Sequence, residues 1–524
     1  MLKHVGSNWA LALVQIVVLV QLKPVQIAAL GVETQGAWLT IASLTSALGL
    51  LILGLPPASV RFIARHVAKG EHEKANEAVA SCLGISLILG MVALLAGALL
   101  YPVFDRVYLQ APAFATLGPA VIAGAKVAYW LAVLQVGLGF GAQVPFGILE
   151  AHHDFFGRNG VRLAGLALRL VLTIVVLRRW PSLVVMGWIQ LAILAGELGT
   201  TLLLIRRRWP KVRIRLRKLE RVRVREILGF SLYAMALMLG TQLSFQADQL
   251  VINGSAGPGQ GTLFDVGNTF FPPLVGLVVG IASVVMPTAT KLQAVGDHQE
   301  LGRLLLRWSK ASYSIALLVG VYLLVLGPEF IGWWMGPSFA GPSGAVTRVL
   351  MASFLVFLPV RGVSSALLLG IGKPRGAALA FVLMGVGNVA LSVALVGPLG
   401  IVGVALGTAI PSVACAAVLM VASCREAGVP VARFVGHVFG KPTLGALPAV
   451  ALLVWLKHGA RIFPRAIEAP RGLATLIPLV AAGLGMVLVF ALAWVLFVYR
   501  HDEDAGPLQK LERYLPAALR GRAR

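Results

Sequence analysis

Long apolar stretches constrain this chain more than any other feature. Each is about 20 residues long, the length that an α-helix needs to cross about 30 Å of hydrocarbon. At two places, around Arg178–Pro181 and Gly397–Gly400, almost no loop separates one apolar stretch from the next. The predicted number of helices therefore has a margin of one. The fourteen stretches are 6–30, 35–60, 79–101, 119–142, 161–177, 182–205, 228–252, 263–287, 310–327, 345–370, 377–397, 400–422, 443–457 and 473–499.

Composition supports the same class. The chain has 524 residues, of which 58% are hydrophobic and only 13% charged. Soluble globular proteins carry about 25% charged residues, so a soluble multidomain enzyme is excluded, and the apolar content excludes disorder. The first apolar run, from Val5 to about Leu30, is too long for a cleavable signal peptide. Three cysteines without a CxxC pair give no disulfide framework and no zinc site.

The basic residues predict an orientation. The net charge is +24, which in a soluble protein would suggest nucleic acid. Here the basic residues instead follow the loops: with the N-terminus inside, 32 of the 45 Lys and Arg residues lie in cytoplasmic segments and 7 in outer ones. The positive-inside rule therefore predicts that both termini are cytoplasmic. The outer loop between 443–457 and 473–499 breaks the pattern with four basic residues.

An internal repeat organises the chain. Gly70-Glu71-His72 matches Gly296-Asp297-His298, and the same constant offset in the numbering also aligns Gly31 with Gly257. Six helices separate the copies, so the repeat is parallel. We therefore predict an all-α polytopic membrane protein of about 14 transmembrane helices, with two six-helix lobes around a central cavity and two extra C-terminal helices. The predicted parts are lobes 1–205 and 228–423, a basic cytoplasmic linker 206–227, helices 13–14 within 424–499 and a basic tail 500–524.

Motifs for covalent chemistry are not supported. Gly436 to Thr443 resembles a P-loop, but its glycine spacing is one residue short and Pro442 interrupts it. His152-His153-Asp154 has no partner cluster, so no metal site is predicted. We find no catalytic arrangement of side chains and expect no enzymatic activity. The linker has two interpretations: it holds the chain on anionic lipid, or it gathers anionic substrate.

Several segments carry a resemblance to a known family. They are Leu30–Trp38, Val60–Asn76, Asp248–Ile252, Leu369–Pro374 and Gly400–Gly407. In their order and spacing, over about residues 1–425, the chain resembles the polysaccharide transporter family. These are the lipid-linked oligosaccharide flippases of the multidrug/oligosaccharidyl-lipid/polysaccharide superfamily. The resemblance implies two six-helix bundles that face a central cavity, alternating access and no covalent chemistry.

The resemblance also implies a function. We expect a flippase of the bacterial cytoplasmic membrane that moves a polyprenyl-diphosphate-linked oligosaccharide to the outer leaflet for polysaccharide biosynthesis. Its partners would be this lipid-linked glycan, membrane lipids and enzymes of the same pathway, with no nucleic acid and no cofactor beyond a possible coupling H⁺ or Na⁺. A drug/cation antiporter of the same superfamily is the alternative. A glycan polymerase or ligase is less favoured because the outer loops are short.

Cations at membrane depth are the candidate substrate-binding residues. A charge in mid-membrane costs about 2.5–3.5 kcal/mol, so such residues usually face a cavity or a partner. Lys126 and Arg348 lie near outer ends, where snorkelling is the alternative, and pairing with Glu197 is favoured for Arg169. Arg61 has an equally good interpretation as a topogenic charge. The full set is Arg361, Lys23, Arg169, Arg61, Lys126 and Arg348.

Arg361 is the strongest of these candidates. It lies twelve residues before Lys373, which is about 18 Å along a helix, and has no acid nearby in the sequence. We expect it to bind the substrate diphosphate. The candidates for ion coupling are Asp248, Asp265 and Glu197; for the first two, pairing with Arg348 or capping a helix is the alternative.

Overall fold

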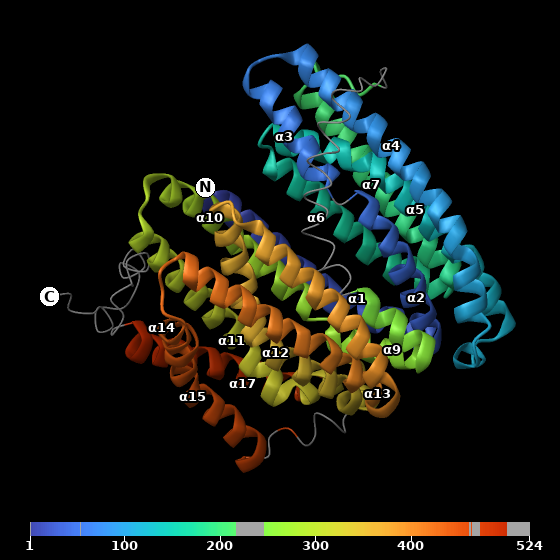
Figure 1. Cartoon of the computed structure of the whole chain (residues 1–524). Coiled ribbons are helices and arrows are strands. Elements are labelled where there is room, and N and C mark those ends of the chain that lie inside the picture. The colour runs from blue at the N-terminus through green and yellow to red at the C-terminus, as the bar shows by residue number, and fades with distance from the viewer. Residues whose placement is uncertain (1, 53, 216–245, 461–462, 464–471, 500–524) are drawn as a thin grey trace. The chain divides into compact units, whose positions relative to one another are not determined.

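The computed structural model describes residues 2–52, 54–215, 246–460, 463 and 472–499 (Figure 1). Within these residues every regular element is a helix and none is a strand, which confirms the predicted all-α class. The predicted tail 500–524 and most of the linker 206–227 lie outside the described residues, as do 228–245 of the seventh stretch. The chain divides into two compact units, which are described separately.

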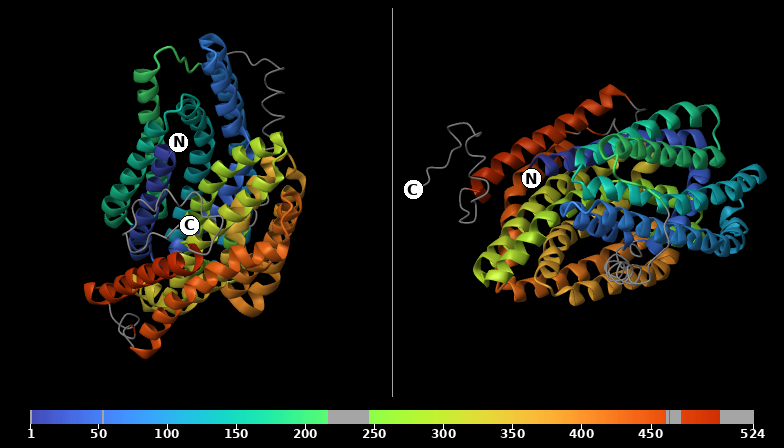
Figure 2. Two further views of the ribbon diagram at one scale, coloured as in Figure 1. Left: turned by 90° about the vertical axis from the view of Figure 1, so that its left-hand side faces the viewer. Right: turned by 90° about the horizontal axis from the view of Figure 1, so that it is seen from above.

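Unit 1 comprises residues 1–262 and 389–404. The long helices α4, α5 and α7 lie side by side in it, and α3 packs on α4 and α5 (Figures 1 and 2). A further helical segment covers 246–255. Its helices are α1 (Leu2–Leu30), α2 (Val32–Leu48), α3 (Leu55–Ala68), α4 (His72–Val103), α5 (Pro119–Ala151), α6 (Phe155–Leu172) and α7 (Leu183–Arg208).

Unit 2 comprises residues 263–388 and 405–524. Its centre is the pair α11 and α12, with α10 packed against both and α15 and α17 packed on α11. The helices are α10 (Phe271–Val295), α11 (His298–Met335), α12 (Pro337–Gly370), α14 (Val431–Phe434), α15 (Lys441–Val454) and α17 (Leu473–Ala493). Two helices cross the boundary between the units: α9 (Pro258–Asn268) and α13 (Pro374–Glu426).

The number of spans agrees with the sequence once its breaks are considered. Eleven described helices are long and apolar enough to cross a membrane, and Val14–Leu30 is a shorter apolar helix. One of the eleven, α13, holds two predicted spans, because Gly400 has φ 57° and ψ −140° and interrupts the helical backbone there. The remaining predicted span, 228–252, lies mostly outside the described residues. The described helices also extend past their apolar stretches, since α4 starts at His72.

Helix α5 contains a cluster of three glycines, Gly137, Gly139 and Gly141, and close helix packing explains two of them. A Cβ at Gly137 would lie 2.7 Å from Leu94 Cδ2, and one at Gly141 would lie 3.2 Å from Leu87 Cδ2. These glycines are one helical turn apart and face α4. Gly139 has open space around its Cβ position, so close packing explains two of the three glycines.

The backbone supports the internal repeat. Gly31 and Gly257 have φ of 83° and 93°, and Gly70 and Gly296 have 71° and 73°. At Gly70 the amide donates to the carbonyl of Val67; at Gly296 it donates to that of Gln293. The two acceptors are related by the same offset as the two glycines. Five turns on the side predicted to be cytoplasmic share this Schellman hydrogen bonding, with the positive φ at Gly70, His153, Gly296, Gly372 and Gly428.

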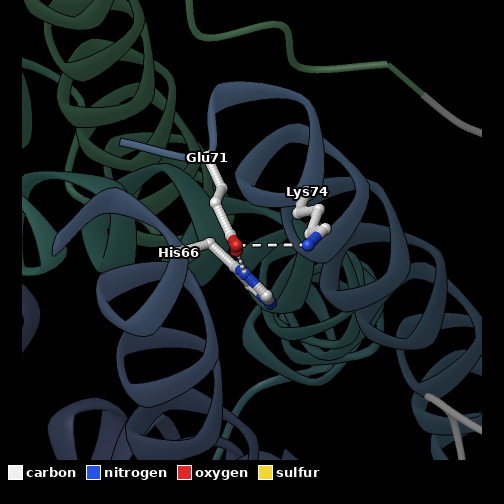
Figure 3. A network of polar contacts seen from close by, with 3 residues as sticks. All are labelled: His66, Glu71 and Lys74. Carbon is white, nitrogen blue, oxygen red and sulfur yellow. Dashed lines mark hydrogen bonds and ion pairs between the residues drawn. The ribbon is translucent and has the colours of Figure 1, made fainter. Parts of the chain in front are cut away.

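Side chains at the two matching turns differ. In unit 1 the Glu71 carboxylate lies 2.7 Å from Nδ1 of His66 and 3.1 Å from Nζ of Lys74 (Figure 3). These hydrogen bonds, that of His66 first, lower the pKa of Glu71 below its ordinary value of 4.5. In unit 2 the matching Asp297 caps α11 by accepting from the amide of Glu300.

Candidate functional site

Arg361 lies on α12 of unit 2 in an aromatic environment. Its guanidinium carbon is 5.7 Å from the ring centre of Phe357 and 6.0 Å from that of Phe381 on α13. The Cys415 thiol, on the other half of α13, interacts with it electrostatically. The rings of α12 and α13 thus hold a cation at membrane depth by cation–π attraction.

Small hydroxyl groups tie the same helices together nearby. Ser423 of α13 donates to Ser364 of α12 over 2.9 Å, and both side chains are buried. The Ser365 hydroxyl donates to the carbonyl of Arg361 itself. These contacts fix the backbone on which Arg361 is carried.

Arg348 lies against the proline-containing part of α11. Pro328 has no amide hydrogen, so the Leu324 carbonyl of α11 has no helical donor. Arg348 Nε donates to this carbonyl over 3.0 Å. Lys457 donates to the next carbonyl, that of Val325, over 2.7 Å and pairs with the buried Glu329 at 2.7 Å. Arg348 therefore supplies a donor to a carbonyl that Pro328 leaves without its helical partner, a contact that its sequence position did not suggest.

Lys126 is paired at the rim of unit 1. Its Nζ lies 2.8 Å from Oδ1 of Asp105, and 41% of its side chain is exposed. This ion pair joins α5 to the segment that follows α4.

Arg169 connects α6 to α7 by a different partner from the one expected. Its Nη2 donates to the Gln190 side chain over 3.0 Å, while Glu197 acts on it only electrostatically. The Glu197 carboxylate lies directly against Gly165, in space that a Cβ would need. Glu197 also interacts electrostatically with Arg162. The polar contacts between α6 and α7 thus involve two arginines of α6 and a glutamine and a glutamate of α7.

Lys23 and Arg61 differ in exposure. Lys23 is buried in α1, with 7% of its surface exposed, beside Pro24 within the helix. Arg61 is exposed on α3. The burial of Lys23 fits a residue that meets a polar partner inside unit 1, and the exposure of Arg61 fits either of its two predicted roles.

The predicted coupling acids do not share one unit. Asp248 is buried in unit 1, where Ser392 donates to its Oδ1 over 3.3 Å. Asp265 is half-buried in α9 and belongs to unit 2. Asp248 thus has a neighbouring hydroxyl group, and a hydroxyl oxygen can take part in a coupling-ion site.

A polar network in unit 1 was not foreseen from the sequence. Asn253 donates to the Gly36 carbonyl over 3.0 Å and to the Thr40 hydroxyl over 2.6 Å. One turn away, the amide of Gly259 donates to Glu33 over 2.9 Å. An asparagine in an apolar run was the available signal, because buried amides need partners.

The comparisons with known proteins can be set against this architecture. Residues 5–293 match the family described as "Polysaccharide biosynthesis protein". The chain belongs to this family. A membrane protein of Bacillus subtilis (strain 168), EpsK, described as uncharacterized, is 25% identical over 468 residues, covering 86% of this chain and 87% of its own.

Two solved structures show the same fold. The lipid II flippase MurJ in an inward closed conformation matches with a TM-score of 0.67 and 14% identity, covering 94% of this chain and 98% of its own. A multidrug transporter of the MATE family in an inward-facing conformation matches with a TM-score of 0.66 and 18% identity, covering 81% and 98%. The present protein is thus a multi-pass membrane protein with the fold of transporters of the MOP superfamily. This result confirms the resemblance found in its sequence motifs.

Proposed function

We propose that this protein is a flippase that moves a polyprenyl-diphosphate-linked oligosaccharide from the cytoplasmic to the outer leaflet of a bacterial inner membrane. It would act by alternating access, without covalent chemistry, and supply cell-surface polysaccharide biosynthesis. The observation that carries the proposal is the family match over residues 5–293, whose description names polysaccharide biosynthesis. In this proposal both termini are cytoplasmic, as the 32-to-7 distribution of basic residues favours.

The extent of the structural matches favours a lipid-linked substrate. The lipid II flippase matches 94% of this chain and the multidrug transporter 81%. The difference is about the size of the C-terminal spans Val431–Gly459 and Leu473–Val498. A drug/cation antiporter remains the second candidate function, because the multidrug transporter matches with a TM-score of 0.66, against 0.67 for the lipid II flippase.

Chemistry of the cations supports the same substrate. A diphosphate cannot cross hydrocarbon without compensation, since burying an isolated charge costs tens of kcal/mol by a Born estimate. Arg361 offers a planar fork that bonds phosphate oxygens in pairs, and Phe357 and Phe381 hold it in place. We assign Arg361 to the diphosphate, and Lys23 stays a candidate substrate-binding residue of unit 1. Glycosyltransferases and a polymerase of the pathway are the expected partners.

Coupling is assigned to Asp248. Its carboxylate is buried beside the Ser392 hydroxyl. The carboxylate and hydroxyl oxygens are suitable ligands for Na⁺, and the carboxylate can also accept a proton. Membrane potential alone would also help, because two negative charges that leave a negative interior gain roughly 4–5 kcal/mol per 100 mV.

Deletion of the gene tests the function. Lipid-linked oligosaccharide should accumulate on the inner leaflet, and the purified protein in liposomes should restore its transfer to the other leaflet. If the deletion leaves the lipid-linked pool unchanged while extrusion of cationic drugs falls, the antiporter function is correct instead.

Arg361→Ala tests the site. Transport should fall by about tenfold to a hundredfold, the range for losing a charge-assisted hydrogen bond of about 1.5–3 kcal/mol, with folded protein near normal. Arg361→Lys should keep part of the activity because a point charge replaces the fork.

Arg348→Ala is the matched control. It frees the Leu324 carbonyl, so folded protein should fall while activity per folded molecule persists. Full transport by a well-expressed Arg361→Ala protein would refute the role of Arg361.

A further inference from the structure

A basic cavity lies at the start of α11 in unit 2. Its volume is about 640 Å³. One wall is the first turns of α11, a second is the turn 427–429 that ends α13, and the third is the short helix α14. Gly302 brings two of these walls together, because a Cβ there would lie 3.0 Å from Val429 Cγ2 and 3.1 Å from the Ala427 carbonyl.

The charged side chains that line this cavity are cationic. Arg303 and Arg307 come from α11 and Arg433 from α14, with His298 at the mouth. Glu300, one turn before Arg303, pairs with it at 3.2 Å but does not line the cavity. Three guanidinium groups from two helices thus line one cavity, and arginine forks match phosphate oxygens in geometry.

The matching place in unit 1 is filled. At the offset of the repeat, Asn76 of α4 corresponds to Gly302. Asn76 donates to the carbonyl of Lys211 over 3.1 Å and accepts from the amide of Arg213 over 2.9 Å. These hydrogen bonds hold the chain that follows α7 in the space beside the first turns of α4, which we call the notch of unit 1. The cavity that remains there measures only about 10 Å³.

The residue at the matching position differs between the two copies. Asn76 binds the chain after α7 by two hydrogen bonds, whereas Gly302 lets the turn after α13 pack directly against α11. The chain that follows α13 turns at Gly428, φ 65°, and leads into α14 beside the cavity. The open notch and its arginines thus belong to one copy of the repeat.

The cavity lies at the ends of two candidate membrane-spanning helices. These two helices are long and apolar enough to cross a membrane, and they begin at His298 and Val431. Beside Arg433, the side chains of Val431 and Val435 are 36% and 42% exposed. Apolar side chains next to a cationic cavity at a span end form the pattern of an interfacial anion site.

We propose that this cavity binds a phosphate group, carried by an anionic phospholipid headgroup or by a free phosphate compound. The site is separate from Arg361 and does not depend on the proposed transport function. Arg303, Arg307 and Arg433 provide the charge, and Arg433 closes the site from α14.

Binding can be measured on the full-length protein in nanodiscs. Phosphatidylglycerol in phosphatidylcholine is the first probe and inorganic pyrophosphate in pure phosphatidylcholine discs is the second, both at matched ionic strength. We expect one of them to raise the thermal unfolding midpoint in a saturable way. Saturation with phosphatidylglycerol alone identifies a lipid headgroup, and saturation with pyrophosphate identifies a free phosphate compound.

Variants separate the cavity from general charge effects. Arg433→Gln removes an exposed side chain and should weaken the apparent affinity about tenfold, and R303Q with R433Q should abolish saturation. Arg375→Gln, an exposed arginine of unit 2 outside the cavity, should change nothing. The proposal fails if neither probe stabilises the wild type, or if Arg433→Gln and Arg375→Gln respond alike. Arg433→Gln alone decides the matter if the double variant does not fold.

Discussion

The first turns of α4 in unit 1 and of α11 in unit 2 have the same backbone and different neighbours. Both follow a glycine with φ near 70° and both close with the same amide-to-carbonyl pattern. At Asn76 the chain after α7 is held by two hydrogen bonds, and at Gly302 a cavity of about 640 Å³ stays open. A repeat thus preserves backbone geometry more strictly than side-chain chemistry, and the difference is where the copies can specialise.

The other end of the repeat should show the largest asymmetry. Gly36 allows α2 to approach Pro258 so closely that a Cβ at that position would overlap the Pro258 carbonyl. Gly36→Ala should therefore cost about 3 kcal/mol in the free energy of unfolding, because no rotamer relieves a clash with backbone. The matching residue Thr262 donates to the Val32 carbonyl over 2.8 Å, and Thr262→Ala should cost about 1 kcal/mol. Chemical unfolding in detergent measures both; equal costs would contradict the asymmetry.

The shared backbone should respond equally in the two copies. Gly70→Ala and Gly296→Ala both place a Cβ at a positive φ, with no neighbouring atom within 4 Å. Each should destabilise the protein by about 1–2 kcal/mol, the cost of a left-handed conformation for an L-residue. Thermal unfolding of the two variants in the same detergent compares them. A clear difference would show that the two turns are not equivalent.

Release of the linker in unit 1 should be a smaller effect. Asn76→Ala removes both hydrogen bonds to residues 211 and 213 and should cost about 1 kcal/mol locally. Trypsin cleavage near Arg213 should then be faster by about fivefold if cleavage follows local opening. Asn76→Asp keeps the acceptor for the Arg213 amide, so its cleavage rate should lie between those of the wild type and Asn76→Ala. Unchanged cleavage in Asn76→Ala would show that other contacts hold the linker.

The acidic pH dependence of the unit 1 turn should be the smallest effect. The pKa of Glu71 is lowered in the folded state, so its contribution to stability is present above its ordinary value of 4.5 and is lost as the pH falls through the lowered value. Glu71→Gln should remove this part of the slope of the thermal midpoint below about pH 4.5. Glu73→Gln, an exposed neighbour, should leave the slope unchanged. An unchanged slope in Glu71→Gln would contradict the role of the His66 and Lys74 contacts.

The sequence predicted the membrane spans well because a span depends on local properties. The break at Gly400 was expected from two glycines between apolar runs, and it is confirmed by the backbone angles there. The side-chain partners were predicted less well. Arg169 was expected to pair with Glu197, but it donates to Gln190 on α7, since the rotation of α6 against α7 is not encoded in sequence distance.

Apolar length, basic loops and an internal repeat determined by themselves that this protein is a helical membrane protein of two related halves. They did so because hydrocarbon thickness and backbone hydrogen bonding leave a chain few choices. Only the tertiary structure decided that Arg348 donates to the carbonyl facing Pro328 and that two aromatic rings lie against Arg361. It also decided that the notch at Asn76 is filled and that a cavity lies beside Gly302. Those contacts depend on which helix faces meet, and packing between residues distant in the chain sets that arrangement.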